Sequence, residues 1–280
     1  MNKAKRVMTQ LWGDFRLWLH APRTLWMIMF MLVLCVLQVR QPWQGYLRDY
    51  SLYANDIIIY HFFDGFNLMM SSSIFLLGCS EMPKRITWQQ QSLIRSSRRS
   101  WLFAYIGQCF LMVFLTITMM VAVTLLLSIG HIRPGIGWSE LERISQMDIL
   151  SSDSIISPFL MENTTPIQGV LMCLTPLMLF WFTMLLVILL FGMTSHPQIG
   201  LLICAFATLS YVCVMDFDGW VSLFAIYRYT SLCRMDLETH GIAHFGKVMM
   251  GYGVIDAGLL ALMTIVVKHI DFALPTNVKC

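Results

Sequence analysis

Charge is scarce in this chain, and that scarcity excludes most classes of soluble protein. Only 12% of the 280 residues are Asp, Glu, Lys or Arg, whereas 57% are hydrophobic. The mean hydropathy is +0.66, and soluble domains carry about 25% charged residues. A soluble enzyme and a disordered chain are both excluded, because neither has so apolar a composition. The sequence predicts an integral membrane protein.

The marks of a secreted, disulfide-bonded domain are also missing. Of the eight cysteines, only Cys233 falls clearly in an external segment, and the others lie in predicted spans, at their ends or at the last residue. Such a distribution does not form a disulfide framework. The amino-terminal segment is amphipathic, and no small-residue cleavage pattern follows the first apolar run, so we expect that run to remain as an anchor.

Long runs without charge divide the chain into six predicted membrane spans. A helix needs about 20 residues to cross a hydrocarbon core of about 30 Å. Residues 163–215 are 53 positions without Asp, Glu, Lys or Arg, which is too long for one crossing, and Pro197 favours a break before it. The predicted spans are 24–41, 57–79, 100–129, 166–193, 197–215 and 247–268. We therefore predict an all-α polytopic membrane protein with a single transmembrane domain, 1–280.

The distribution of Lys and Arg predicts the orientation of these spans. With the termini inside, residues 1–23, 80–99, 194–197 and 268–280 are cytoplasmic and hold 12 of the 19 basic residues. Cytoplasmic loops carry an excess of Lys and Arg. We expect both termini in the cytoplasm, and the segments 131–165 and 216–246 outside the cell.

Two segments outside the spans have amphipathic patterns. In residues 1–21 one helical face gathers Val7, Met8, Leu11, Trp12, Phe15, Trp18 and Leu19. This pattern predicts a helix lying in the membrane surface with its aromatic side down. The pattern leaves open whether this helix is only an anchor or also docks a partner.

The loop at 80–99 is the most informative segment. It holds five of the nineteen basic residues, and Thr87 and Gln90 are spaced for a capping box. Ile86, Leu93 and Ile94 recur at helical spacing, so a short amphipathic helix is expected just outside the bilayer. Such a helix can press on a partner, or its arginines can hold the topology by contacting lipid phosphate.

These features together resemble the permease subunits of ABC-2 type transporters, especially the small bacterial permeases encoded beside a separate ATPase. The resemblance covers the whole chain in topology and residues 71–101 in motif. The motif consists of Ser71-Ser72-Ser73-Ile74-Phe75-Leu76-Leu77 followed by Gln91-Ser92-Leu93-Ile94-Arg95-Ser96-Ser97-Arg98-Arg99-Ser100-Trp101. The loop 131–165 is longer than the usual link between spans three and four, so the external side does not carry over simply.

The resemblance implies a function and a set of partners. Residues 1–21 would be the connecting helix, and 83–96 the coupling helix that docks in a cleft of an ATPase. Two permeases and two ATPase subunits would export a hydrophobic or amphipathic substrate, such as a peptide, antibiotic or lipid, across a bacterial plasma membrane. ATP and Mg²⁺ would bind the ATPase, with no cofactor in this chain, and no nucleic-acid partner is expected. The candidate coupling residues are Lys84, Arg85, Trp88, Arg95, Arg98 and Arg99.

Polar residues inside the spans are candidates for a second role. Asp64 and Asp256 are single carboxylates in apolar surroundings, so each is expected to face protein or water. Tyr60, Asp64, Asn67 and Ser71 would form a polar stripe on one face of a helix. The stripe and Asp256 could line a translocation path, or the stripe could bind another span through hydrogen bonds. Close helix packing of the last span is predicted from Gly246, Gly251, Gly253, Ala257 and Gly258.

Two motifs resemble ligand sites but do not complete them. Residues 241–248 follow the phosphate-binding loop pattern, but Val248 stands where Ser or Thr must hold magnesium. His240 and His244 have metal-ligand spacing without the glutamate of a metalloprotease. We read both as coincidental.

A second class of function remains open from the sequence. The chain could act alone, as an immunity or sensor protein that binds a peptide with its external loops. It could also be a secondary carrier using Asp64 and Asp256, although carriers usually show internal repeats, and none is detectable between the two halves.

Overall fold

α-Helices make up almost all of the part of the chain that the structure describes. The computed structural model describes residues 3–44, 52–63, 65–80, 82, 98–135, 137–138, 158–194, 197–213, 230 and 241–269. No β-strand occurs among these residues, and an isolated parallel bridge joins Leu52 to Ile132. The all-α class predicted from composition is confirmed for this part of the chain.

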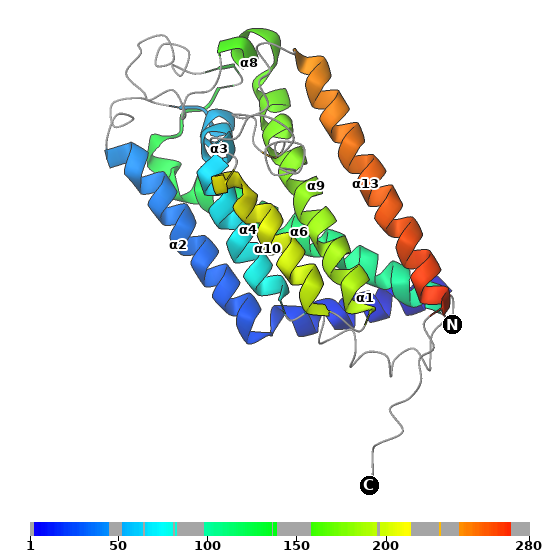
Figure 1. Ribbon diagram of the computed structural model, residues 1–280. Helices are drawn as coiled ribbons and strands as arrows, with labels where there is room; N and C mark the ends of the chain where they lie inside the picture. The colour runs from blue at the N-terminus through cyan, green and yellow to red at the C-terminus, as the bar shows by residue number, and fades with distance from the viewer. Residues whose placement is uncertain are drawn as a thin grey trace.

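The first two helices meet at an elbow beside a proline. α1 runs over Lys3–Leu19 and α2 over Pro22–Gln44. Proline disfavours helical geometry in the residue before it and suits the first position of a helix, so the break falls at His20 and Ala21. The N–H of Ala21 donates to the Trp18 carbonyl at 3.0 Å. α1 therefore lies across the lower end of the bundle in Figure 1, while α2 rises along its left edge.

The second apolar segment is broken into two helices. α3 covers Ala54–Phe63 and α4 covers Gly65–Cys79, and their axes are bent by 77°. Glycine has a low helix propensity, so Gly65 favours a new helix starting there. The predicted span over 57–79 is therefore bent at this point, whereas the predicted polar stripe needs a continuous helix.

The remaining helices complete the bundle. α6 spans Arg98–Leu127 and is followed by the 3-10 helix η2, Ile129–His131; α8 spans Pro158–Asn163, α9 Pro166–Gly192, α10 Pro197–Cys213 and α13 Ile242–His269. A capping box starts α9: the Gln168 backbone N–H donates to Thr165 Oγ1, and the Thr165 N–H donates to Gln168 Oε1. This cap fixes the start of α9 at Pro166.

Several helices are long and apolar enough to cross a membrane. Among the described residues there are four, lying within α2, α6, α9 and α13, or five if the bent pair α3 and α4 forms one span. α10 is apolar but has only 17 residues. The chain is a multi-pass membrane protein, and the predicted number of six spans is reached only if the bent pair and α10 each count as one.

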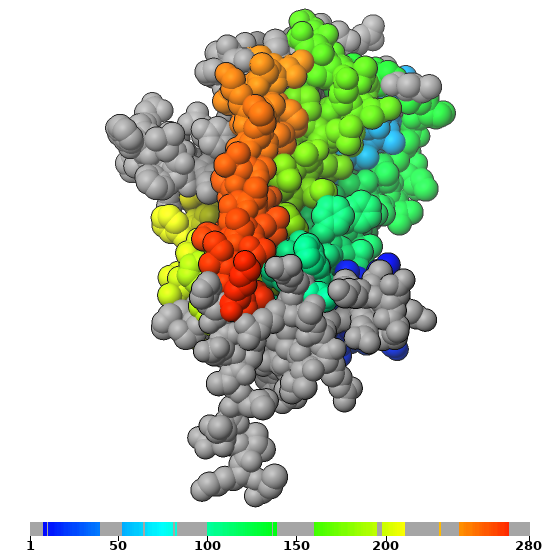
Figure 2. Space-filling model, turned by 90° about the vertical axis from the view of Figure 1, so that its right-hand side faces the viewer, coloured from blue at the N-terminus to red at the C-terminus, as the bar shows by residue number. Residues whose placement is uncertain are grey.

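α9 lies in the middle of the bundle and organises it. It packs against α3, α6, α10 and α13, while α2 packs against α4 and α6. α13 stands at the edge, on the opposite side from α2 in Figure 1, and Figure 2 shows it exposed along its length. The core thus consists mainly of side chains from α6 and α9, with further buried side chains from α2, α3 and α4.

The aromatic face of α1 does not all point toward lipid. Phe15 and Trp18 are buried in the protein, with 7% and 4% of their surfaces exposed, whereas Met8 and Trp12 are 68% and 63% exposed. α1 packs chiefly against α6. The prediction that the whole aromatic side faces the membrane surface is wrong, because the bundle end offers part of that face an apolar protein surface.

The glycine-rich face of α13 is not packed against the part of the chain that the structure describes. A Cβ added at Gly246, Gly251, Gly253 or Gly258 would meet no atom within 4 Å. Close packing predicted from these residues is therefore wrong for this chain. The side of α13 that packs on α9 and α6 instead holds buried residues such as Tyr252, Asp256 and Met263.

Candidate functional site

The end of the bundle beside α1 brings together segments that are far apart in the sequence. Arg23 lies at the start of α2, and its Nη1 donates to the Oγ of Ser80, the residue directly after α4, at 2.7 Å. Ser80 Oγ in turn donates to the Leu77 carbonyl at 2.7 Å. Two residues earlier, a Cβ on Gly78 would lie 2.9 Å from Met27 Cβ, so α2 and α4 approach closely here. The elbow is thus bonded to the residue at which the 80–99 loop begins.

α1 also contacts the helix at which that loop ends. A Cβ on Gly107 of α6 would lie 2.8 Å from Leu11 Cδ1 of α1. α6 starts at Arg98, so Gly107 lies two and a half turns after the loop. Both ends of the basic loop therefore lie at the end of the bundle that α1 covers.

The candidate coupling residues lie mostly outside the described part of the chain. This holds for Lys84, Arg85, Trp88 and Arg95, and for the predicted helix 83–96. Arg98 and Arg99 belong to the first turn of α6, but their side chains also lie outside the described residues. Their coupling role stays a prediction.

The predicted polar stripe is divided between two helices. Tyr60 lies on α3 and Asn67 and Ser71 on α4, while Asp64 between them lies outside the described residues. Ser71 Oγ donates to the carbonyl of Leu68 in its own helix at 2.9 Å, so it does not bond to another span. The bend between α3 and α4 separates these residues, and no continuous polar face joins them.

Asp256 faces protein and joins two helices. Its side chain is 7% exposed, and Thr183 Oγ1 of α9 lies 2.7 Å from Asp256 Oδ1 as a hydrogen-bond donor. One turn earlier on α13, the Tyr252 hydroxyl lies 3.1 Å from Thr230 Oγ1, and both side chains are buried. These two contacts form the polar part of the surface by which α13 packs on the bundle.

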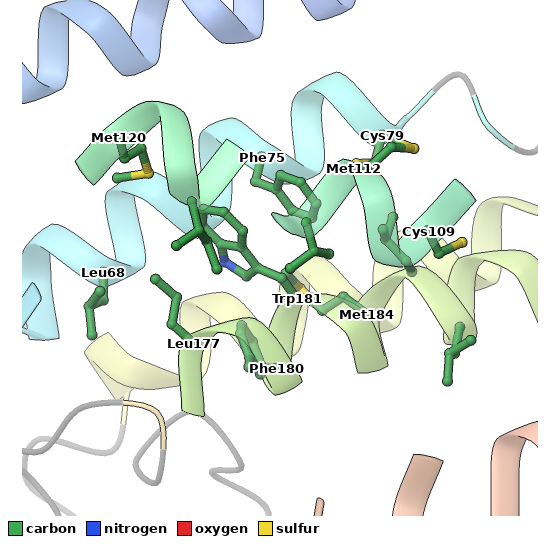
Figure 3. Close-up of a cluster of buried hydrophobic side chains, with 14 of the residues drawn as sticks. Leu68, Phe75, Cys79, Cys109, Met112, Met120, Leu177, Phe180, Trp181 and Met184 are labelled. Atoms are coloured by element: carbon green, nitrogen blue, oxygen red, sulfur yellow. The ribbon is translucent and has the colours of Figure 1, made fainter. Parts of the chain in front are cut away.

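A buried contact that the sequence reasoning missed connects α4 to α9. Trp181 is fully buried, and its Nε1 donates to Ser72 Oγ at 2.8 Å. Its ring stacks on Phe75, with centroids 4.3 Å apart and an interplanar angle of 6°, as Figure 3 shows at the centre of the core. A tryptophan in the middle of an apolar run signals such a partner, because its N–H needs an acceptor when buried.

The structure offers no support for a nucleotide or metal site among the described residues. No group of three His, Cys, Asp or Glu side chains there could hold a metal ion. Gly241, with φ +69°, precedes α13, but residues 242–248 are already helical. A phosphate-binding loop needs irregular backbone whose N–H groups surround the phosphate, and a helix cannot supply it.

Comparison with known proteins does not place the chain in a family. No family model, curated protein or solved structure matches it. The resemblance to ABC-2 permeases therefore rests on topology and on the residues of the segment 71–101.

Proposed function

We propose that this chain is the membrane-spanning subunit of an ABC-2 type exporter, driven by a separate ATPase that docks at the α1 end of the bundle. Six spans with both termini in the cytoplasm belong to the same proposal. The substrate would be a hydrophobic or amphipathic compound, and two copies of the chain would pair with two ATPase subunits. ATP and Mg²⁺ would bind the partner.

The arrangement of α1 carries the proposal. α1 lies across the end of the bundle and contacts α6 at Gly107, and α2, which follows α1 at the elbow, bonds from Arg23 to Ser80 directly after α4. The loop 80–99 therefore starts beside the first turn of α2 and ends at α6, the helix on which α1 packs. A force on this loop would reach α4 and α6 directly, since both helices begin or end there.

The charge of the loop fits a docking role. Five of its twenty residues are Lys or Arg and one, Glu81, is acidic. Basic residues next to a membrane also bind anionic lipid, so the experiment must separate docking from lipid contact. The control residue is Arg133, an arginine that is exposed at the far end of the bundle. Its backbone N–H donates to the carbonyl of Leu52.

The test is affinity purification of the tagged full chain from its native membrane in mild detergent, followed by identification of its partners and an ATPase assay. We expect an ATPase subunit in equal amount, and loss or uncoupling of hydrolysis when Arg95, Arg98 and Arg99 are replaced by alanine. Arg133→Ala is the control and should leave both unchanged. A chain recovered alone, or a triple variant that keeps its partner and full hydrolysis, would contradict the docking role.

The alternative that the same experiment addresses is a stand-alone membrane protein. It predicts no co-purifying ATPase, and peptide binding that depends on the external segments 131–165 and 216–246. The predicted translocation path along Tyr60, Asn67 and Ser71 also remains to be tested, because the bend between α3 and α4 divides it.

A further inference from the structure

The contacts between Asp256 and Thr183 require more hydrogens than an ionised pair contains. Thr183 Oγ1 lies 2.7 Å from Asp256 Oδ1 and 2.9 Å from the carbonyl oxygen of Leu179 in its own helix. A threonine hydroxyl has one hydrogen, whereas an ionised carboxylate and a backbone carbonyl only accept. If Asp256 is ionised, the two short contacts must therefore share a single hydrogen.

Among the described residues, no positive charge lies near Asp256 to stabilise an ionised form. α13 packs on α9 and α6. α9 contains no Asp, Glu, Lys, Arg or His, and the charged residues of α6 are Arg98 and Arg99 in its first turn. On α13 itself, Lys247 and Lys268 are about 14 Å and about 18 Å from Asp256 along the helix axis. The histidines of α13 are at its two ends, His244 and His269.

The surroundings of Asp256 also favour its neutral form. The side chain is 7% exposed, and Asp256 lies near the middle of α13. An isolated carboxylate in apolar surroundings is so unfavourable that the group takes up a proton instead. The buried titratable groups of the three helices are phenols and thiols, which carry no positive charge in either state: Tyr105, Cys109, Cys173 and Tyr252.

We propose that Asp256 is a proton-binding site, and that the bound proton completes the Asp256–Thr183 pair and holds α13 against α9. A neutral Asp256 brings its own O–H, so the pair has two hydrogens, and Thr183 can bond to Asp256 and to Leu179 at once. If α13 separates from α9, Asp256 meets water and gives up its proton to it, because an ordinary carboxyl group is ionised at pH 7. The site does not depend on whether the chain is a permease.

The proposal predicts the sign of a pH effect. The packed state holds one proton more than the separated state at pH 7. Raising the pH therefore favours separation of α13, and lowering the pH favours packing. Asparagine has nearly the shape of a neutral aspartic acid, but it does not titrate. Asp256→Asn should therefore keep α13 in place and remove this part of the pH dependence.

The first experiment detects the bound proton directly. The full chain is labelled with a heavy carbon isotope in its aspartate side chains and placed in phosphatidylcholine nanodiscs at pH 7. A protonated carboxylic acid has an infrared C=O stretching band that a carboxylate lacks. We expect this band in the wild type, shifted by the isotope, and its loss in Asp256→Asn. The control is Glu162→Gln, because Glu162 is an exposed carboxyl residue of α8, and it should leave the band unchanged.

The second experiment measures the effect of the proton on stability. Thermal midpoints of the full chain in detergent are compared at pH 7 and pH 9. We expect the wild-type midpoint to fall by about 2–4 °C more than that of Asp256→Asn. If Asp256→Asn does not fold, Thr183→Val replaces it in the infrared experiment. It should shift the acid band without removing it, because the acid keeps its proton and loses its hydrogen-bond partner.

Each outcome supports or overturns the proposal. A wild type without an aspartic acid band at pH 7 has an ionised Asp256 and overturns it. So does a band that persists in Asp256→Asn, or that Thr183→Val leaves unshifted, because the proton then belongs to another aspartate. An equal effect of pH on the wild type and on Asp256→Asn overturns the role of the proton in holding α13.

Discussion

Replacing Thr183 with valine tests whether the Asp256 contact holds α13 on the bundle. The Thr183 hydroxyl lies 2.7 Å from Asp256 Oδ1 and 2.9 Å from the Leu179 carbonyl of its own helix. Removing Thr183 and removing Asp256 therefore have different consequences. Without Asp256 the hydroxyl still has Leu179, whereas without the hydroxyl the carboxyl group loses a donor while 7% exposed.

The expected energies follow from this asymmetry. Leaving a buried polar group without its partner costs about 1–3 kcal/mol, and hydrogen bonds between membrane helices average about 0.6 kcal/mol. Thr183→Val should therefore lower the free energy of unfolding by about 1–3 kcal/mol. Asp256→Ala should lower it by less than about 1 kcal/mol, because it removes the buried carboxyl group and leaves Thr183 bonded. The double variant should resemble Asp256→Ala.

The measurement is a double-mutant cycle on the full chain in mixed micelles, with unfolding by sodium dodecyl sulfate followed by helical circular dichroism. Thr116→Val is a suitable control, since it removes a buried hydroxyl that bonds within its own helix. The reasoning is refuted if Thr183→Val is as stable as the wild type. It is equally refuted if Asp256→Ala destabilises the chain more than Thr183→Val does.

Two further predictions concern the core. Trp181→Phe keeps an aromatic ring on Phe75 but loses the hydrogen bond to Ser72, so we expect the free energy of unfolding to fall by about 1 kcal/mol in the same assay. Trp181→Ala should lower it by about 3–5 kcal/mol. Gly78→Ala places a Cβ against Met27, and we expect this overpacking to lower the free energy of unfolding by about 1–3 kcal/mol. Gly253→Ala, on the open face of α13, should be neutral or stabilising, and an equal effect at both glycines would contradict the close approach of α2 and α4.

The candidate site was only partly predictable from sequence. Asp256 stands out as a charge in an apolar span, because an ionisable residue there needs a polar partner. Its partner Thr183 has no such mark, since a threonine usually bonds to its own helix. The Arg23–Ser80 bond likewise joins residues 57 positions apart. No local pattern identifies that pair, because it depends on how α2 and α4 pack.

The helical character of this protein, its placement in a membrane and an amphipathic segment ahead of the first span all follow from the sequence alone. Long runs without charge and the break before Pro197 carry this information locally, because backbone hydrogen bonds in lipid must be satisfied within each helix. The tertiary structure adds the bend between α3 and α4, the burial of Phe15 and Trp18 on α1, and the open glycine face of α13. The helices of this chain are apolar on nearly every side, so hydrophobicity does not distinguish a face that contacts lipid from a face that contacts protein. The packing of the helices against one another determines which faces are buried.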